Sequence, residues 1–150
     1  MFEYRYEHRV RYREADPMGI VYHTHYLDYF EAARTEALRA AGLAYNSLEQ
    51  GGMFMPVVDV SLTYKRPARY DDLIVVHTRM ILSSSTTRLR FDYDVFRKNE
   101  PSVLVSGHVT LCFYDRNLEK PIRAPRQVVS LLTELNAVEA KPETETTQAP

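Results

Sequence analysis

Asp16 is the residue of this sequence with the clearest potential for chemistry, because it opens the turn Asp16-Pro17-Met18-Gly19 just before a predicted helix. The first N–H groups of a helix have no partner within it, and the helix dipole adds partial positive charge at that end. A carboxylate beside such donors combines a base or nucleophile with an oxyanion site, which suits attack on an acyl carbonyl. Taken alone, however, an Asp-Pro pair is also typical of a simple turn.

The helix that positions this turn is predicted over about residues 23–41. Thr24 is its expected N-cap, and Gly42 is expected to end it. Arg34 falls on the apolar face, where an unpaired guanidinium would be costly, so we expect a partner such as Glu31. On a helical wheel the apolar face consists of Tyr26, Leu27, Phe30, Ala33, Ala37, Leu38 and Ala41.

Alternating apolar and polar residues predict five strands. They lie at about residues 4–13, 55–66, 73–82, 87–96 and 103–114. The last four strands are joined by short connections, which favour antiparallel neighbours, and all are longer than the helix, so the sheet should curve around it. The predicted fold is therefore α+β: a curved, five-stranded antiparallel sheet around one long central helix, in the order β-α-β-β-β-β.

The C-terminal part of the chain is predicted to add little to this fold. A short helix is expected over residues 126–135. Residues 137–150 contain no aromatic residue and, apart from Val138, no large aliphatic one, so we expect a disordered polar tail there. The rest, residues 1–136, is predicted to be one domain, since 150 residues can bury one core.

Composition argues against several classes of protein and site. The net charge of −1 gives no case for nucleic acid, and no apolar run approaches the roughly 20 residues that span a bilayer. The N-terminus lacks the pattern of a secretory signal, so we expect a cytoplasmic protein. The single cysteine, Cys112, rules out an internal disulfide and is expected to be a small buried thiol. His23 and His25 diverge on a helix, so we expect no metal site.

The turn and helix together carry a family resemblance. The strand, the turn D-P-M-G-I-V-Y-H and the helix containing F-E-A-A-R-T-E resemble the hotdog-fold acyl-CoA thioesterases, over about residues 4–135. The branch most similar to the sequence is that of 4-hydroxybenzoyl-CoA thioesterase and the thioesterases associated with the Tol-Pal system. P-A-R-Y-D-D at residues 67–72 is a secondary marker. The most specific positions are Asp16, Gly19, Val21-Tyr22-His23, Tyr26 and Glu31 to Arg34.

The resemblance implies an enzyme that hydrolyses an acyl-CoA thioester to a free acid and CoA without a cofactor. Asp16 would be the catalytic carboxylate, either as nucleophile or as general base, and the backbone N–H of His23 would donate to the thioester oxygen. Gly19 would serve as a turn residue with positive φ, as a point of close approach to substrate, or as both. Two other functions stay open: a noncatalytic acyl-thioester binding protein and an acyl-carrier-protein thioesterase.

Several aromatic side chains are candidates for binding the acyl group. Tyr22, Tyr26, Phe30 and Met55 would line an aromatic slot or simply belong to the core. The imidazole of His23 would line the same slot, tune Asp16, or be a satisfied, partly buried histidine. The resemblance does not fix the acyl group, which is short, long or aromatic.

Binding of CoA and assembly of subunits involve the later strands. The resemblance implies a homodimer or homotetramer formed by strand pairing, in which residues near Val58 wall the pocket of a neighbouring subunit. The CoA nucleotide needs basic groups, although arginines on strands commonly serve only solubility. The basic candidates are Lys65, Arg66, Arg69, Arg88 and Arg90.

Overall fold

The structure is a computed structural model that describes residues 2–141, with the backbone alone for residues 45–47. Its helices are η1 (a 3-10 turn, Tyr12–Glu14), α1 (His25–Ala40), α2 (Tyr45–Gln50) and α3 (Arg126–Glu134). Its strands are β1 (Phe2–Arg9), β2 (Met53–Phe54), β3 (Val57–Tyr64), β4 (Leu73–Leu82), β5 (Arg88–Arg97), β6 (Val103–Asp115) and β7 (Lys120–Ile122). Within residues 2–141, no helix is both long enough and apolar enough to cross a membrane.

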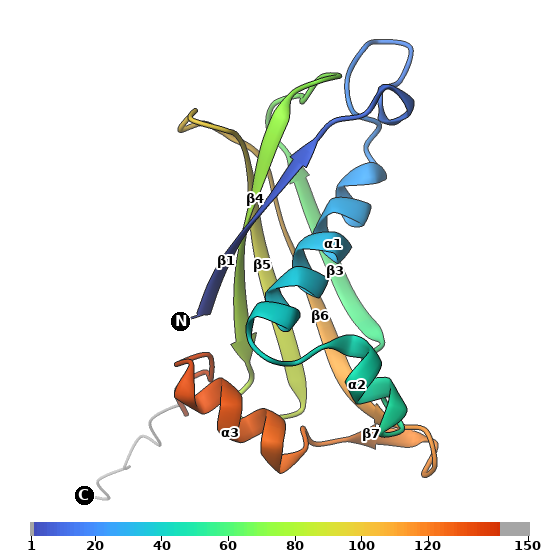
Figure 1. The fold of residues 1–150 in the computed structure, drawn as a ribbon, viewed down its shortest axis with the longest axis vertical. Helices are drawn as coiled ribbons and strands as arrows, with labels where there is room; N and C mark the ends of the chain where they lie inside the picture. Colours follow the sequence, from blue (N-terminus) through green and yellow to red (C-terminus); the bar gives the residue numbers. More distant parts are fainter. Residues whose placement is uncertain (1, 142–150) are drawn as a thin grey trace, which may run out of the picture.

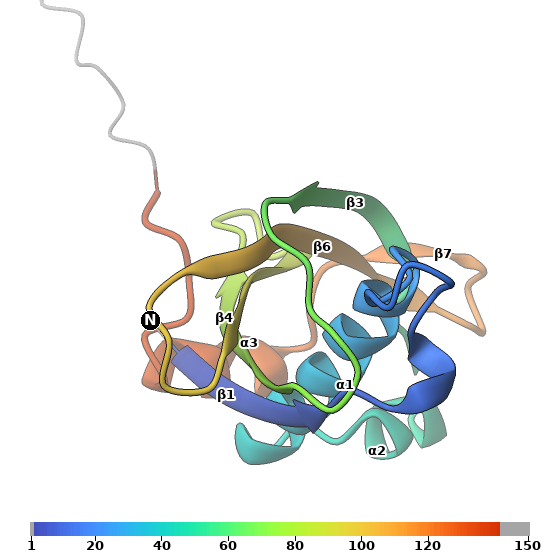
Figure 2. The same ribbon diagram turned by 90° about the horizontal axis from the view of Figure 1, so that it is seen from above.

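The strands form a sheet that curls around α1 (Figure 1). The five long strands pair antiparallel in the spatial order β1, β4, β5, β6 and β3, as predicted for an α+β fold of this kind. Seen from above, β1 and β3 lie on opposite sides of α1 (Figure 2). The predicted number of five strands is wrong: within residues 2–141 the sheet has seven, because the short strands β2 and β7 also pair with β6.

Close packing of α1 on the sheet depends on Phe30 and Gly107. The Phe30 ring is fully buried and stacks on the ring of Tyr93 in β5, with 4.1 Å between the centroids. A Cβ at Gly107 of β6 would lie 2.9 Å from the Phe30 ring and 2.4 Å from the carbonyl oxygen of Ser61. Glycine at this position therefore lets the helix and a neighbouring strand approach β6 closely.

The buried face of α1 differs in part from the predicted one. Leu27, predicted on that face, is 39% exposed, whereas Tyr29 is 3% exposed. Tyr29 is buried because β1 covers this side of the helix and brings His8 to 4.6 Å from it, centroid to centroid. Arg34 is buried as its position predicted, and it donates to the Tyr93 hydroxyl at 3.3 Å. Thr24 is the N-cap residue, although its side chain makes no capping bond.

Two predicted boundaries also need correction. β1 ends at Arg9 instead of continuing to residue 13, because the Arg11 N–H donates to the Glu14 carboxylate at 2.8 Å and starts η1. At the other end, the N–H of Glu139 donates to the carbonyl oxygen of Leu82 at 2.7 Å. The packed body therefore extends beyond residue 136, and the predicted disorder of residues 142–150 lies outside the described residues. Cys112 is a buried free thiol, as predicted.

Candidate functional site

The loop from Glu14 to Tyr22 folds back on itself and presents Asp16 at its turn. The N–H of Tyr22 donates to the Glu14 carbonyl oxygen at 2.9 Å, and the N–H of Asp16 donates to the Ile20 carbonyl oxygen at 2.8 Å. Gly19 has a φ of 77°, and a Cβ there would meet nothing within 4 Å. The turn therefore requires glycine for its backbone conformation. The space beside Gly19 is open, and close approach of substrate to it stays a prediction.

The Asp16 carboxylate takes part in this turn with one of its two oxygens. Oδ1 accepts the N–H of Met18 at 2.8 Å and that of Ile20 at 3.4 Å. The turn role expected of an Asp-Pro pair is thus confirmed. Within residues 2–141, Oδ2 has no hydrogen-bond donor and the carboxylate has no ion-pair partner. One oxygen of a half-buried carboxylate is therefore available to a substrate or a water molecule.

A backbone donor without an acceptor lies at the start of α1. The N–H of His25 donates to the Tyr22 carbonyl oxygen at 3.0 Å, but no group within residues 2–141 accepts the N–H of His23. Tyr64 of β3 holds the peptide that follows, between His23 and Thr24, since its hydroxyl donates to the His23 carbonyl oxygen at 3.0 Å. The His23 imidazole is exposed, so of the three alternatives the satisfied, partly buried histidine is wrong, and the ring packs edge-on against Tyr22 at 4.4 Å.

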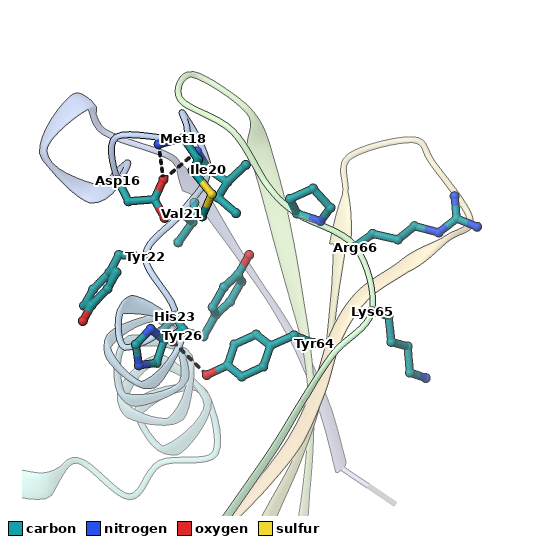
Figure 3. A pocket seen from close by; sticks show the side chains of 11 residues that line it. Asp16, Met18, Ile20, Val21, Tyr22, His23, Tyr26, Tyr64, Lys65 and Arg66 are labelled. Atoms are coloured by element: carbon teal, nitrogen blue, oxygen red, sulfur yellow. Dashed lines mark hydrogen bonds between the residues drawn. The ribbon is translucent and has the colours of Figure 1, made fainter.

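A hollow of about 480 Å³ brings these groups together, lined by the Asp16 loop, the start of α1 and the end of β3. In Figure 3 the Tyr64 ring points toward His23, while Lys65 and Arg66 extend away from Asp16. Tyr26 is 2% exposed at the base of the hollow. Its burial raises the pKa of the phenol, an effect that a hydrogen bond from the Ala68 backbone offsets only in part. The hydroxyl is therefore neutral at physiological pH.

Not every predicted site residue lies here. Asp16, Tyr22, His23, Tyr26 and Lys65 line the hollow, and Gly19 lies in the Asp16 loop. Phe30 does not line the hollow. It is a fully buried core residue whose ring stacks on Tyr93.

The basic candidates on β5 are also outside it. Arg88 is exposed on β5, and Arg90 bonds Asp92 at 2.7 Å beside a separate polar hollow of about 310 Å³. Val58 is 49% exposed on β3, where only a neighbouring subunit would give it the predicted role.

Sequence reasoning missed Tyr64 and Ile20 as lining residues. A signal for Tyr64 was present, because it ends the alternating apolar series of β3 with a ring that has a polar tip. Ile20 carried no such signal, since only the fold-back of the loop turns it into the hollow. The loop at residues 66–72 is drawn in by the Val21 N–H, which donates to the Ala68 carbonyl oxygen at 2.8 Å.

Glu14, the other acid of this segment, has a very different environment. The residue is 5% exposed, and its carboxylate accepts hydrogen bonds from His8 Nε2 at 2.7 Å, the Arg11 N–H at 2.8 Å and the Tyr29 hydroxyl at 3.2 Å. Burial alone would raise the pKa of Glu14, but these bonds outweigh it and hold the pKa below its ordinary value. Burial and the Glu14 charge together raise the pKa of Tyr29. Glu14 is therefore an ionised acceptor with no oxygen facing the hollow of Asp16.

The chain matches one protein family over most of its length, and it is similar in sequence to two named proteins. The family model described as Thioesterase-like superfamily matches residues 10–132. The chain is 31% identical over 127 residues to "Acyl-CoA thioester hydrolase YbgC" of Escherichia coli O6:H1, which covers 85% of this chain and 93% of that protein. It is 46% identical over 72 residues to "Putative acyl-CoA thioesterase YneP" of Bacillus subtilis, a match with 48% of this chain and only 52% of that protein, about half its length.

A solved structure supports the same fold. The DHNA-CoA thioesterase of Staphylococcus aureus matches with a TM-score of 0.82 and 28% sequence identity, over 91% of this chain and 93% of that chain. The similarity thus extends over the strands and the helix that position the hollow of Asp16.

Proposed function

The chain belongs to the thioesterase-like superfamily and is a thioester hydrolase, and we propose that it hydrolyses acyl-CoA with Asp16 as its catalytic carboxylate. The observation that carries this proposal is the pair of unsatisfied groups in one hollow. Oδ2 of Asp16 can act on an acyl carbon, and the N–H of His23 can stabilise charge on the thioester oxygen. The name of the Escherichia coli relative supports acyl-CoA as the substrate.

Two routes use the same arrangement. In the first, Oδ2 attacks the acyl carbon, the carbon–sulfur bond breaks, CoA leaves as a thiolate, and water hydrolyses the mixed anhydride on Asp16. In the second, Asp16 takes a proton from a water molecule, the hydroxide attacks the acyl carbon, and the proton passes to the departing thiolate. A single turnover in ¹⁸O-labelled water separates them, because label enters the Asp16 carboxylate only by the first route when water attacks the aspartyl carbon.

The acyl group would lie against the aromatic side chains of the hollow, Tyr22, Tyr26 and Tyr64. Lys65 lies at the rim, where its ammonium could contact the phosphates of CoA. Assignment to the branch of 4-hydroxybenzoyl-CoA thioesterase and the Tol-Pal-associated thioesterases is part of this proposal, and it leaves open whether the acyl group is short, long or aromatic.

A homodimer or homotetramer is also part of the proposal. β3 pairs only with β6 among the described strands, so its other edge carries unpaired backbone groups. Val57, Val58 and Val60 on this strand are 43 to 49% exposed. Such an edge suits pairing with a second copy, which would cover these valines and complete the wall of the hollow. Light scattering should show an oligomer, and Val60→Lys should weaken it.

The experiment that tests the function is a thiol-release assay on short, medium, long and aromatic acyl-CoAs and on an acyl-carrier protein with the same acyl groups. We expect release of CoA thiol with saturable kinetics. Binding of acyl-CoA without release of thiol would contradict the proposal and favour a noncatalytic binding protein. Faster release from the carrier protein than from every acyl-CoA would move the substrate to that partner.

A further inference from the structure

We propose that Glu14 is a positioning residue for the reaction: it holds the Asp16 loop and the start of α1 in the mutual arrangement that hydrolysis requires. The inference rests on the proposed role of Asp16. The Glu14 carboxylate is buried, and the proposed mechanism does not use it.

Three segments of the chain converge on the Glu14 side chain. His8 belongs to β1, Arg11 precedes η1, and Tyr29 lies one turn inside α1, yet each donates a hydrogen bond to the same carboxylate. Bonds to an ionised acceptor are stronger than neutral ones, and burial strengthens them further. The carboxylate therefore fixes the position of α1 relative to β1 and to the segment that leads into the Asp16 loop.

The backbone of Glu14 transmits this position to the site. Its carbonyl oxygen accepts the N–H of Tyr22 at 2.9 Å, which closes the base of the loop. Ala15 bridges to Val21 on the next rung, and the N–H of Asp16 bonds to Ile20 on the one after it. These three successive pairs, Glu14–Tyr22, Ala15–Val21 and Asp16–Ile20, form a short antiparallel ladder. Asp16 lies at one end of it, and at the other end Tyr22 is followed directly by His23, whose N–H is the proposed oxyanion donor. A displacement of Glu14 would therefore move both groups relative to each other.

Glu14 acts from outside the reaction hollow. It lines a different hollow of about 390 Å³, between β1 and α1, together with His8, His25 and Tyr29. The two hollows share no lining residue: along α1, Tyr26 faces the reaction hollow while His25 and Tyr29 face the other. Glu14 thus reaches the substrate only through the residues that it positions.

The first test compares Glu14→Gln and Tyr29→Phe with a matched control. Gln keeps the size of the side chain and the acceptor for Arg11 but removes the charge, and Phe removes one donor to Glu14. Tyr93→Phe is the control, because Tyr93 is equally buried but its hydroxyl faces Arg34 in the core. With fold verified by circular dichroism, we expect kcat to fall about tenfold for Glu14→Gln and about threefold for Tyr29→Phe, with KM little changed, since small misplacements of reacting groups are costly. Tyr93→Phe should keep the wild-type kcat.

The second test repeats Glu14→Gln in an Asp16→Asn background. If Glu14 acts through Asp16, the tenfold loss of kcat should shrink to about twofold in this background, because the catalytic carboxylate is gone and Glu14 then positions only the start of α1. An equal loss in both backgrounds, or a kcat within about twofold of wild type for Glu14→Gln alone, would overturn the inference. If instead Asp16→Asn keeps wild-type turnover, the proposed function itself fails, and the two failures are distinguishable.

Discussion

Glu14 and Asp16 are two carboxylates separated by one residue, and the fold gives them opposite surroundings. Glu14 is 5% exposed, with both oxygens engaged by side-chain and backbone donors from three segments. Asp16 is half-buried, with one oxygen bonded to the backbone of its own turn and the other directed to no donor within residues 2–141. Residue type alone therefore does not distinguish the two acids. The oxygen without a donor beside a hollow is what makes Asp16, and not Glu14, the proposed reacting acid.

The largest effect on stability is expected from Glu14→Ala. It leaves the buried Tyr29 hydroxyl and the part-buried donors of His8 and Arg11 without their acceptor, which should lower the free energy of unfolding by about 3 kcal/mol. Asp16→Ala removes only bonds at the half-exposed turn and should cost about 1 kcal/mol. Urea unfolding of both variants measures the contrast, and equal losses would mean that the two acids do not differ in structural role.

The pH dependence of stability should follow Glu14. Its pKa is lower in the folded protein than in the unfolded chain, so its contribution to stability is complete above the ordinary value of 4.5 and is lost as the pH falls through the lowered pKa. Glu14→Gln lacks this titration. The difference in unfolding free energy between wild type and Glu14→Gln should therefore shrink on acidification, and a difference that grew would contradict the depressed pKa.

A smaller effect is expected at the tip of the Asp16 loop. Gly19→Ala should cost about 1 kcal/mol of stability, because alanine is strained at a φ of 77° although nothing obstructs its Cβ. Gly42→Ala is the control, since Gly42 has a φ of 87° at the far end of α1. Similar losses are expected from both by urea unfolding. A rise of KM for Gly19→Ala alone would show that substrate approaches this backbone.

The smallest effect is expected on KM, and it should differ between a basic residue at the hollow and one outside it. Lys65→Ala should raise KM for acyl-CoA by about threefold, as loss of one exposed contact to a phosphate should. Arg90→Ala should leave KM unchanged, because Arg90 is paired with Asp92 beside another hollow. Steady-state kinetics on one acyl-CoA tests both variants. A larger rise of KM for Arg90→Ala than for Lys65→Ala would place the CoA nucleotide beside β5, in the same subunit or in a neighbouring one.

Local patterns in the sequence were enough to predict the long strands, α1 and the turn at Asp16, because the periodicity of strands and helices and the preferences of turns depend on residues close together in the sequence. They could not predict β2 and β7, which are two and three residues long and exist only because β6 extends beside them. Phe30 illustrates the limit for the site. Its position on the apolar face of α1 fits both a pocket wall and a core, and only the close approach allowed by Gly107 decides for the core.

The converging bonds on Glu14 show the same limit. His8 and Tyr29 are distant from each other along the chain, and each looked like an ordinary member of an alternating or helical pattern. Only the packing of α1 against β1 brings them to one carboxylate. Contacts between elements, unlike the elements themselves, depend on residues that no local pattern connects.

The proposed role of Asp16 is best tested by the single-turnover rate constant for thiol release by Asp16→Asn, with enzyme in excess over acyl-CoA. Asn keeps an oxygen for the Met18 and Ile20 N–H groups, so the turn and the unfolding free energy should be preserved while the carboxylate is lost. We expect a rate constant lower by about a hundredfold or more. A folded Asp16→Asn variant that releases thiol at the wild-type rate would contradict the proposed role.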